Sequence, residues 1–203
     1  MEAKSHWEAI YQQKRPTDVS WYAPHLHVSL ELLARAGLSR NSRVIDVGGG
    51  ASTLVDDLLD RQIEHLTVLD VSGRAMTGSM ARLGERARRV NWIEADITEA
   101  TLPSHCYDLW HDRALFHFLT SIDQRRRYLK VMCDSLTPVG QVILATFSLQ
   151  GPPRCSGLEV VRYSPETLQR ELPEFKLVEA LQDAHPTPFH TVQQFIYCRF
   201  QRV

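Results

Sequence analysis

Three aspartates and a run of three glycines are spaced along the chain in a way that suits one kind of ligand. Asp46 lies two residues before the run Gly48-Gly49-Gly50, Asp70 comes 24 residues after Asp46, and Asp96 follows further on. Glycines at the end of a strand let the chain turn sharply and let a ligand approach the backbone. Each acid alone is as readily a turn residue or a helix N-cap. Jointly, with one acid suited to ribose hydroxyls and another to an adenine amino group, they favour an adenosyl ligand.

The same glycine-rich turn occurs in nicotinamide-binding proteins and in turns that bind nothing. Dinucleotide sites need a third glycine, in the pattern G-x-G-x-x-G, where this chain has Thr53. The carboxylate of Asp46 would repel a pyrophosphate, whereas it suits the amino group and sulfonium of S-adenosylmethionine. The Tyr-x-x-x-Lys pair of many nicotinamide oxidoreductases is also missing. The pattern favours S-adenosylmethionine over a nicotinamide cofactor, and a turn without a ligand is the structural alternative.

The elements that must position these acids repeat a pattern of short apolar strand, turn and amphipathic helix. Strands are expected at 43–47, 66–69, 90–94, 107–110 and 142–147, with a helix at 26–36 ahead of them. Two last strands, at 175–181 and 192–200, have no helix between them and should pair antiparallel. The pattern predicts an α/β fold, doubly wound around a seven-stranded, mostly parallel sheet with a C-terminal antiparallel hairpin. Such a sheet binds its ligand at the carboxyl ends of the strands.

Length and composition set the limits of this interpretation. The 203 residues are 43% hydrophobic and 23% charged, as expected for one domain. We divide it into an N-terminal segment at 1–37, a cofactor-binding core at 43–147, and a substrate loop with the hairpin at 148–203. The net charge of −1 argues against nucleic acid or an anionic membrane as a partner. Four scattered cysteines, no signal-peptide pattern and no apolar run of ~18 residues predict a cytoplasmic protein.

The chain resembles the class I S-adenosylmethionine-dependent methyltransferases over nearly its whole length. Asp46-x-Gly48-x-Gly50 is similar to their first motif, Asp70 to their ribose-binding acid, and Asp96-Ile97 to their adenine-contacting pair. Residues 136–140 resemble the turn before their fifth strand, whereas Ser52 stands where many members carry a third glycine. The resemblance implies a Rossmann-like fold, S-adenosylmethionine as cofactor with S-adenosylhomocysteine as product, and no metal. The expected cofactor-binding residues are Trp7, Tyr11, Trp21, Asp46, Gly48, Gly49, Gly50, Asp70, Val71, Asp96, Ile97 and His111.

A narrower resemblance involves residues 110–115, with the sequence W-H-D-R-A-L, and the aromatic N-terminal segment. Both are similar to thiopurine S-methyltransferase-type enzymes and to methyltransferase-like proteins that modify protein lysines, although Ala114 replaces the usual glycine. In these groups an aromatic N-terminal segment covers the cofactor. The aromatic side chains at 7–22 could also simply pack on the edge of the sheet, so a lid and an edge cover are both open.

Methyl transfer is an in-line displacement, so the enzyme mainly aligns the reactants and excludes water. In the loop expected at 111–117, His111 and His117 are candidate general bases, and Asp112 could accept a proton or orient the cofactor. A packed histidine and a helix-capping aspartate are the structural alternatives. The residues expected to contact the substrate are Tyr22, Arg113, Phe116, Cys155 and Tyr163.

Two histidine pairs, at 25 and 27 and at 185 and 190, lack a cysteine or acid at ligand spacing, so no metal site is expected. The leading hypothesis is a methyltransferase that acts on a sulfur, nitrogen or oxygen atom of a small molecule. A protein lysine methyltransferase of the same fold is the alternative, and a non-catalytic protein that binds the cofactor as a regulator is a further one.

Overall fold

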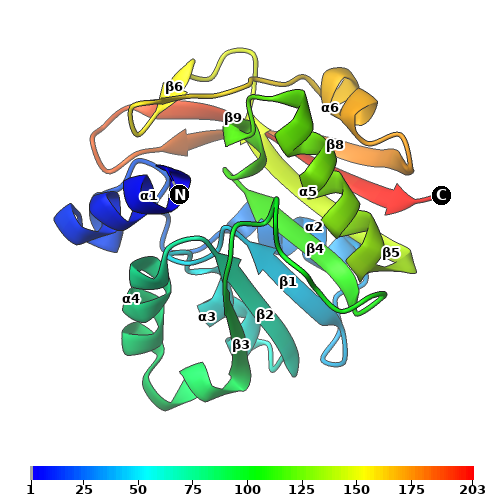
Figure 1. Cartoon of the computed structure of the whole chain (residues 1–203), viewed down its shortest axis with the longest axis horizontal. Helices are drawn as coiled ribbons and strands as arrows, with labels where there is room; N and C mark the ends of the chain where they lie inside the picture. The colour runs from blue at the N-terminus through cyan, green and yellow to red at the C-terminus, as the bar shows by residue number, and fades with distance from the viewer. Residues whose placement is uncertain (1) are drawn as a thin grey trace.

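The computed structural model describes residues 2–203 and contains a seven-stranded sheet with helices on both faces (Figure 1). The helices are α1 (Glu2–Gln13), α2 (His27–Arg35), α3 (Leu54–Asp60), α4 (Gly73–Leu83), α5 (Ile122–Ser135) and α6 (Pro165–Glu171), with short 3-10 turns η1 (Pro16–Asp18), η2 (Gly84–Arg89) and η3 (Phe116–Phe118). The strands are β1 (Arg43–Val47), β2 (His65–Asp70), β3 (Val90–Glu94), β4 (Tyr107–Arg113), β5 (Leu136–Phe147), β6 (Arg154–Cys155), β7 (Leu158–Glu159), β8 (Phe175–Pro186) and β9 (Val192–Arg202).

The strand order in the sheet is β3-β2-β1-β4-β5-β9-β8. Strands β1 to β5 run parallel, and β9 joins β5 and β8 antiparallel. The predicted α/β fold with its C-terminal antiparallel hairpin is therefore confirmed. Because the carboxyl ends of parallel strands meet at one edge, the residues that end β1, β2 and β4 are brought together there.

Strand β5 begins earlier than expected. Residues 136–140, interpreted as a turn, lie inside it, because Leu136 already pairs with Tyr107 at the start of β4. The register shifts between Tyr107 and Leu109 and so absorbs the extra residues as an irregularity of the ladder.

Successive side chains of a strand point to opposite faces, and the sheet accordingly has two cores. One core lies under α2 and α3 and contains Val44 of β1 and Leu109 of β4. The other lies under α5 and α6 and contains Ile45 of β1 and Trp110 of β4. Parallel strands covered on both faces read as continuous apolar runs, which is why the sequence pattern located them.

Helix α1 lies beyond the carboxyl edge of the sheet and beside α4 (Figure 1). Its Glu8 carboxylate accepts hydrogen bonds from the Ser72 hydroxyl at 3.0 Å and from the Arg74 backbone N–H at 3.2 Å. An anion at the N-terminus of a helix is favoured by the helix dipole, so Glu8 attaches α1 to the start of α4. Lys4 pairs with Glu94 at the end of β3, at 2.5 Å.

Within residues 2–203, no helix has the length and apolar character needed to cross a membrane. The division of the chain into three functional parts stays a prediction.

Candidate active site

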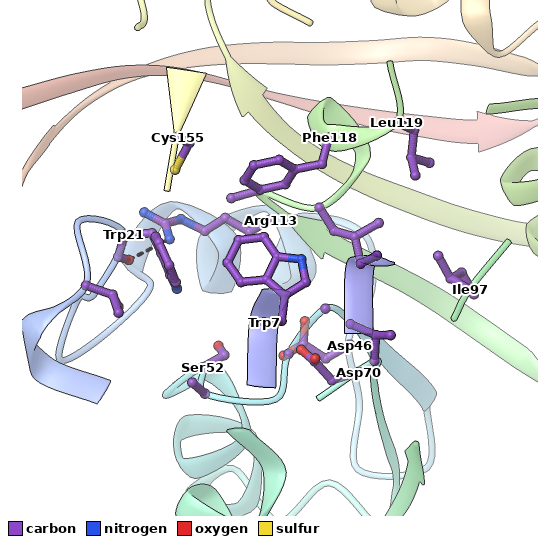
Figure 2. A pocket seen from close by; sticks show the side chains of 18 of the residues that line it. Trp7, Trp21, Asp46, Ser52, Asp70, Ile97, Arg113, Phe118, Leu119 and Cys155 are labelled. Carbon is purple, nitrogen blue, oxygen red and sulfur yellow. Dashed lines mark hydrogen bonds between the residues drawn. The ribbon is translucent and has the colours of Figure 1, made fainter. Parts of the chain in front are cut away.

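A cavity of about 840 Å³ lies between the carboxyl edge of the sheet and the N-terminal segment (Figure 2). The glycine loop after β1, the ends of β2 and β4, and α1 with the segment that follows it all contribute to its wall. The structure brings together here the following residues predicted from the sequence: Trp7, Tyr11, Trp21, Tyr22, Asp46, Gly48, Gly49, Asp70, Val71, Asp96, Ile97, His111, Arg113 and Cys155.

Asp46 ends a buried chain of hydrogen bonds. Its Oδ1 lies 2.7 Å from His111 Nδ1, and His111 Nε2 lies 2.8 Å from the Ser29 hydroxyl of α2. A carboxylate only accepts, so Nδ1 carries the proton in this bond. Asp46 Oδ2 is buried with no partner in the described part of the chain. Because such an atom is costly to leave unpaired, it fits a cofactor with an amino group to donate.

His111 is not placed to act as a general base. Both ring nitrogens of His111 are engaged, and only 1% of its side chain is exposed. The prediction that His111 is catalytic is corrected on this ground. Its position opposite Asp46 in the β1–β4 ladder makes it a positioning residue for that carboxylate.

Asp70 is held ready to accept further hydrogen bonds. Its Oδ2 accepts from the Gly50 N–H at 2.9 Å, and its Oδ1 accepts from the Ser72 N–H at 2.8 Å. Burial raises the pKa of this carboxyl to about 6, and the two backbone N–H groups oppose the shift. The two oxygens keep free lone pairs, as a ribose diol requires.

Gly50 donates its N–H to Asp70 and does not line the cavity. This corrects the prediction that it contacts the cofactor directly. A Cβ at Gly50 would lie 2.7 Å from the Asp70 carboxyl carbon and 2.8 Å from the Ala75 Cβ. Gly48 is needed for a different reason, because its φ of +74° is a left-handed conformation that favours glycine. The glycine run thus gives the backbone both its turn and its closeness to the acid.

Asp96 follows the end of β3. Its Oδ1 accepts from the Thr98 N–H and from the Thr98 hydroxyl, both at 2.8 Å. This Asx-turn fixes the side chain, while Ile97 beside it is buried and also lines the cavity. A carboxylate next to an apolar surface suits an adenine, with its amino group and flat ring.

An aromatic cluster, defined as Trp7, Tyr11, Trp21 and Phe118, lines the other side of the cavity; Figure 2 shows Trp7, Trp21 and Phe118 there. Trp7 meets Trp21 edge to face at a centroid distance of 5.8 Å and Phe118 at 5.1 Å. Tyr11 meets Trp21 at 6.4 Å. Such pairs stabilise one another beyond the area they bury. The cluster both packs the N-terminal segment on the core and lines the cavity; its mobility without a cofactor stays a prediction.

Asp112 lies outside the cavity, which corrects its predicted catalytic role. It is fully buried; Oδ1 accepts from the N–H groups of Leu115 and Phe116 at 3.0 and 3.2 Å, and Oδ2 accepts from the Tyr128 hydroxyl at 2.8 Å. Burial raises the pKa of this carboxyl to about 6. Since neighbouring strand residues alternate, Asp112 points into the core under α5 while Arg113 lines the cavity.

Phe116, His117 and Tyr163 are also enclosed by the core and are absent from the cavity wall. Phe116 and Tyr163 pack against each other, with ring centroids 5.8 Å apart. His117 Nδ1 accepts from the Phe147 N–H at 3.2 Å, and burial lowers the pKa of its imidazole to about 3. The predicted catalytic role of His117 and the predicted substrate contacts of Phe116 and Tyr163 are therefore corrected.

The buried His117 makes stability depend on pH. Its folded pKa of about 3 lies below the unfolded value near 6.5, so its stabilising contribution is complete above pH 6.5 and is lost as the pH falls. Between pH 7 and pH 5 we expect the wild type to lose about 2 kcal/mol more unfolding free energy than His117→Asn, whose amide oxygen can replace Nδ1 as acceptor. Urea unfolding at the two pH values measures this, and equal losses in both proteins would place the imidazole in contact with water.

Arg113 and Cys155 lie together at the end of the cavity formed by Trp21 (Figure 2). Arg113 Nε donates to the Tyr197 hydroxyl at 2.7 Å, and Nη1 donates to the Trp21 carbonyl at 2.8 Å. Burial raises the pKa of the Cys155 thiol, which keeps it neutral and a poor nucleophile. Both side chains are therefore suited to contacting a ligand rather than to attacking one.

Several lining residues were not predicted. They include His6, Leu26, Ser52, Thr53, Phe118, Leu119, Gln124 and Arg127. Phe118 lies in η3, which follows β4, so its place in the connection after a strand was a usable signal. The others come from helices or their flanks, where a single residue carries no pattern. No grouping of His, Cys, Asp and Glu side chains that could hold a metal ion occurs among residues 2–203.

Comparison with known proteins agrees with this geometry. A family described as methyltransferase domain matches residues 44–140, from β1 into β5. The mouse eEF1A lysine and N-terminal methyltransferase is 23% identical over 138 residues, which are 68% of this chain and 19% of that protein. The chain thus spans about a fifth of the length of this curated relative.

Solved structures match over almost the whole chain. A Burkholderia thailandensis 1,6-didemethyltoxoflavin-N1-methyltransferase, solved with S-adenosylhomocysteine, has a TM-score of 0.76 and 20% identity, and the match covers 99% of this chain and 87% of that one. The N-methyltransferase NodS from Bradyrhizobium japonicum WM9, also with S-adenosylhomocysteine, has a TM-score of 0.72 and 19% identity, covering 96% and 97%.

The sheet order and its terminal hairpin are those of the Rossmann-like class I methyltransferases. The chain therefore has the fold of these enzymes, its residues 44–140 match a methyltransferase domain, and the three acids lie around the cavity at the carboxyl edge of the sheet.

Proposed function

We propose that the protein transfers the methyl group of S-adenosylmethionine to a sulfur, nitrogen or oxygen atom of a small molecule. The observation that carries this proposal is the aromatic end of the cavity, which is enclosed by Trp7, Trp21 and Phe118 and contains the guanidinium of Arg113. A cavity of about 840 Å³ lies within the range of roughly 300–1,000 Å³ typical of small-ligand sites.

Three acids of this chain would hold the cofactor. Asp46 Oδ2 accepts from its amino group, Asp70 accepts from its ribose hydroxyls, and Asp96 accepts from its adenine amino group. When bound, the cofactor supplies a methyl group already activated by a positive sulfur. The hydrogen bonds that the backbone and His111 make to these acids fix their directions before binding, so little ordering free energy is lost on binding.

The acceptor end aligns the acceptor and excludes water. The rings of Trp7, Trp21 and Phe118 offer rigid apolar surfaces, which restrict the orientation of a planar or apolar acceptor. Neither His111 nor His117 is available as a base, for the reasons given above. We therefore expect the acceptor's own nucleophilic atom to be reactive at neutral pH, with alignment supplying most of the acceleration.

A protein lysine acceptor is the second candidate, since the mouse relative is named for acting on a lysine and an N-terminus. The charge of Arg113 opposes it, because a lysine ammonium at this end would face a like charge. Residues 110–115 resemble both thiopurine S-methyltransferase-type enzymes and proteins that modify lysines, so this stretch does not separate the two candidates. A cytoplasmic location, and the lack of nucleic-acid and membrane partners, stay predictions.

Labelling separates the two candidates. The protein is incubated with methyl-labelled S-adenosylmethionine and a cell extract divided into low-molecular-mass and protein fractions. Mass spectrometry should find the label in the low-molecular-mass fraction, and Asp70→Asn should reduce that label strongly. Label confined to lysine side chains of the protein fraction would favour the second candidate instead.

A further inference from the structure

Arg113 carries a charge that has no counter-ion in the described part of the chain, residues 2–203. Its guanidinium has hydrogen bonds to two neutral oxygens, and its Cζ lies 4.7 Å from the centre of the Phe195 ring. Among residues 2–203, no carboxylate lies within ion-pair distance of it, and no hydrogen bond from Nη2 is formed. Arg125 and Arg199, which are also partly buried, each pair with a glutamate. The unpaired charge therefore indicates a ligand.

The electric field around Arg113 is consistent with this. Burial lowers the pKa of His185, and the Arg113 charge lowers it further. Burial and, second, the Arg113 charge also lower the pKa of His117. Asp183, which acts on His185 from the same hairpin, forms no ion pair with Arg113. A positive potential of this kind, in a cavity with low-dielectric walls, attracts an anion.

The charges of the cavity are separated by function. Asp46 and Asp70 lie on the side of the glycine loop, whereas Arg113 lies on the side of Trp21 and Cys155 (Figure 2). The acids suit the cationic cofactor. The arginine is held in place by the Tyr197 hydroxyl, the Trp21 carbonyl and the Phe195 ring, so its remaining N–H groups are pre-organised for a planar oxyanion.

We propose that the methyl acceptor carries an anionic group, with an aromatic or apolar body, and that Arg113 binds this group. The proposal rests on the proposed function and names the class of its substrate. The body of the acceptor lies against Trp7, Trp21 and Phe118, and its carboxylate or a similar oxyanion pairs with Arg113. Arg113 is in this respect the residue that determines substrate charge, since a cationic acceptor would face an uncompensated like charge.

The test measures binding to the complex with S-adenosylhomocysteine, using pairs of probes that differ only in charge. Benzoate is compared with benzamide, and indole-3-acetate with indole-3-acetamide, by calorimetry at low ionic strength. We expect the anion of at least one pair to bind ten or more times more tightly than its amide. Salt should reduce this preference, because it rests on charge.

Three variants assign the preference to its source. Arg113→Gln should abolish it, and Arg113→Lys should retain part of it because the charge remains. Arg126→Gln is the matched control, since Arg126 is an exposed arginine that does not line the cavity. This control should keep the full preference.

Two sets of results would overturn the proposal. One is an absence of any preference for the anions in the wild type, whether all probes bind equally or none binds. The other is an equal preference for the anions in Arg113→Gln and in Arg113→Lys. Failure of the proposed function is distinguishable from both, because it would appear as a wild type that does not bind S-adenosylhomocysteine at all.

Discussion

Replacement of Asp70 by asparagine is expected to weaken binding of S-adenosylhomocysteine by at least thirtyfold, or roughly 2–3 kcal/mol. Charge-assisted hydrogen bonds to the ribose diol are lost in the variant. One carboxylate oxygen is also replaced by an amino group, which would face the N–H of Gly50 or of Ser72, donor against donor. Calorimetry with S-adenosylhomocysteine measures the loss directly.

The unliganded thermal midpoint should change little in this variant. The raised pKa of Asp70 means that burial disfavours the charged carboxyl in the folded protein, which offsets the hydrogen bonds that asparagine loses. Asp108→Asn is the matched control, because Asp108 pairs with Arg43 at 2.7 Å and does not line the cavity. Its affinity for S-adenosylhomocysteine should equal that of the wild type.

The pH dependence of binding sharpens this test. With a pKa of about 6 in the unliganded protein, Asp70 takes up a proton as the pH falls from 7 to 5, and the protonated group no longer accepts from both hydroxyls. Wild-type affinity should therefore fall over this interval, while that of Asp70→Asn stays flatter. Unchanged affinity at pH 7 in Asp70→Asn would reduce Asp70 to a turn residue.

The sequence was sufficient for the sheet because parallel strands buried on both faces are continuous apolar runs. It also placed the three acids at the carboxyl edge of the sheet, because each lies at or near the end of a strand. Asp46 and Asp70 illustrate this: their positions in the chain alone place both at the carboxyl edge of β1 and β2.

The error over Asp112 has a specific structural cause. The fourth strand was expected to end at Trp110, so the residues after it were treated as a loop in which every side chain could reach the ligand. The strand in fact continues to Arg113. Because side chains alternate along a strand, Asp112 points into the core, where the Tyr128 hydroxyl of α5 donates a hydrogen bond to it. His111 and Arg113 lie on the cavity side.

The hydrogen-bond partners of the acids could not be predicted from the sequence, for another reason. Ser29, on α2, completes the hydrogen-bond chain to Asp46 from 82 positions before His111. Such a contact depends on how the helix packs on the sheet and leaves no local pattern. The absence of a counter-ion for Arg113 is likewise visible only when all surrounding side chains are placed.

Removal of α1, residues 1–13, is expected to lower affinity for S-adenosylhomocysteine about a hundredfold. The helix supplies Trp7 and Tyr11 to the cavity wall, and Glu8 joins it to α4, beside Asp70. Without it the cavity opens to water on one side and the remaining Trp21 and Phe118 lose their central ring. Circular dichroism should still report a folded α/β core, because its first strand begins at Arg43.

Point variants test the same helix in the full chain. Trp7→Ala should lower the affinity about tenfold, since it deletes the ring that contacts both Trp21 and Phe118. Phe189→Ala is the matched control, because Phe189 is an aromatic residue that is 55% exposed and lies outside the cavity wall. It should bind S-adenosylhomocysteine like the wild type.

Hydrogen exchange distinguishes a lid from a fixed wall. If ligand contacts contribute the free energy that orders the N-terminal segment, the amides of residues 7–22 should gain protection when S-adenosylhomocysteine is added. Those of β1, already buried, should not change. Equal protection with and without ligand, together with full affinity after removal of α1, would reduce the aromatic cluster to edge packing. Water exclusion at the acceptor end would then depend on Phe118, Arg113 and Cys155, which line the cavity and lie outside the N-terminal segment.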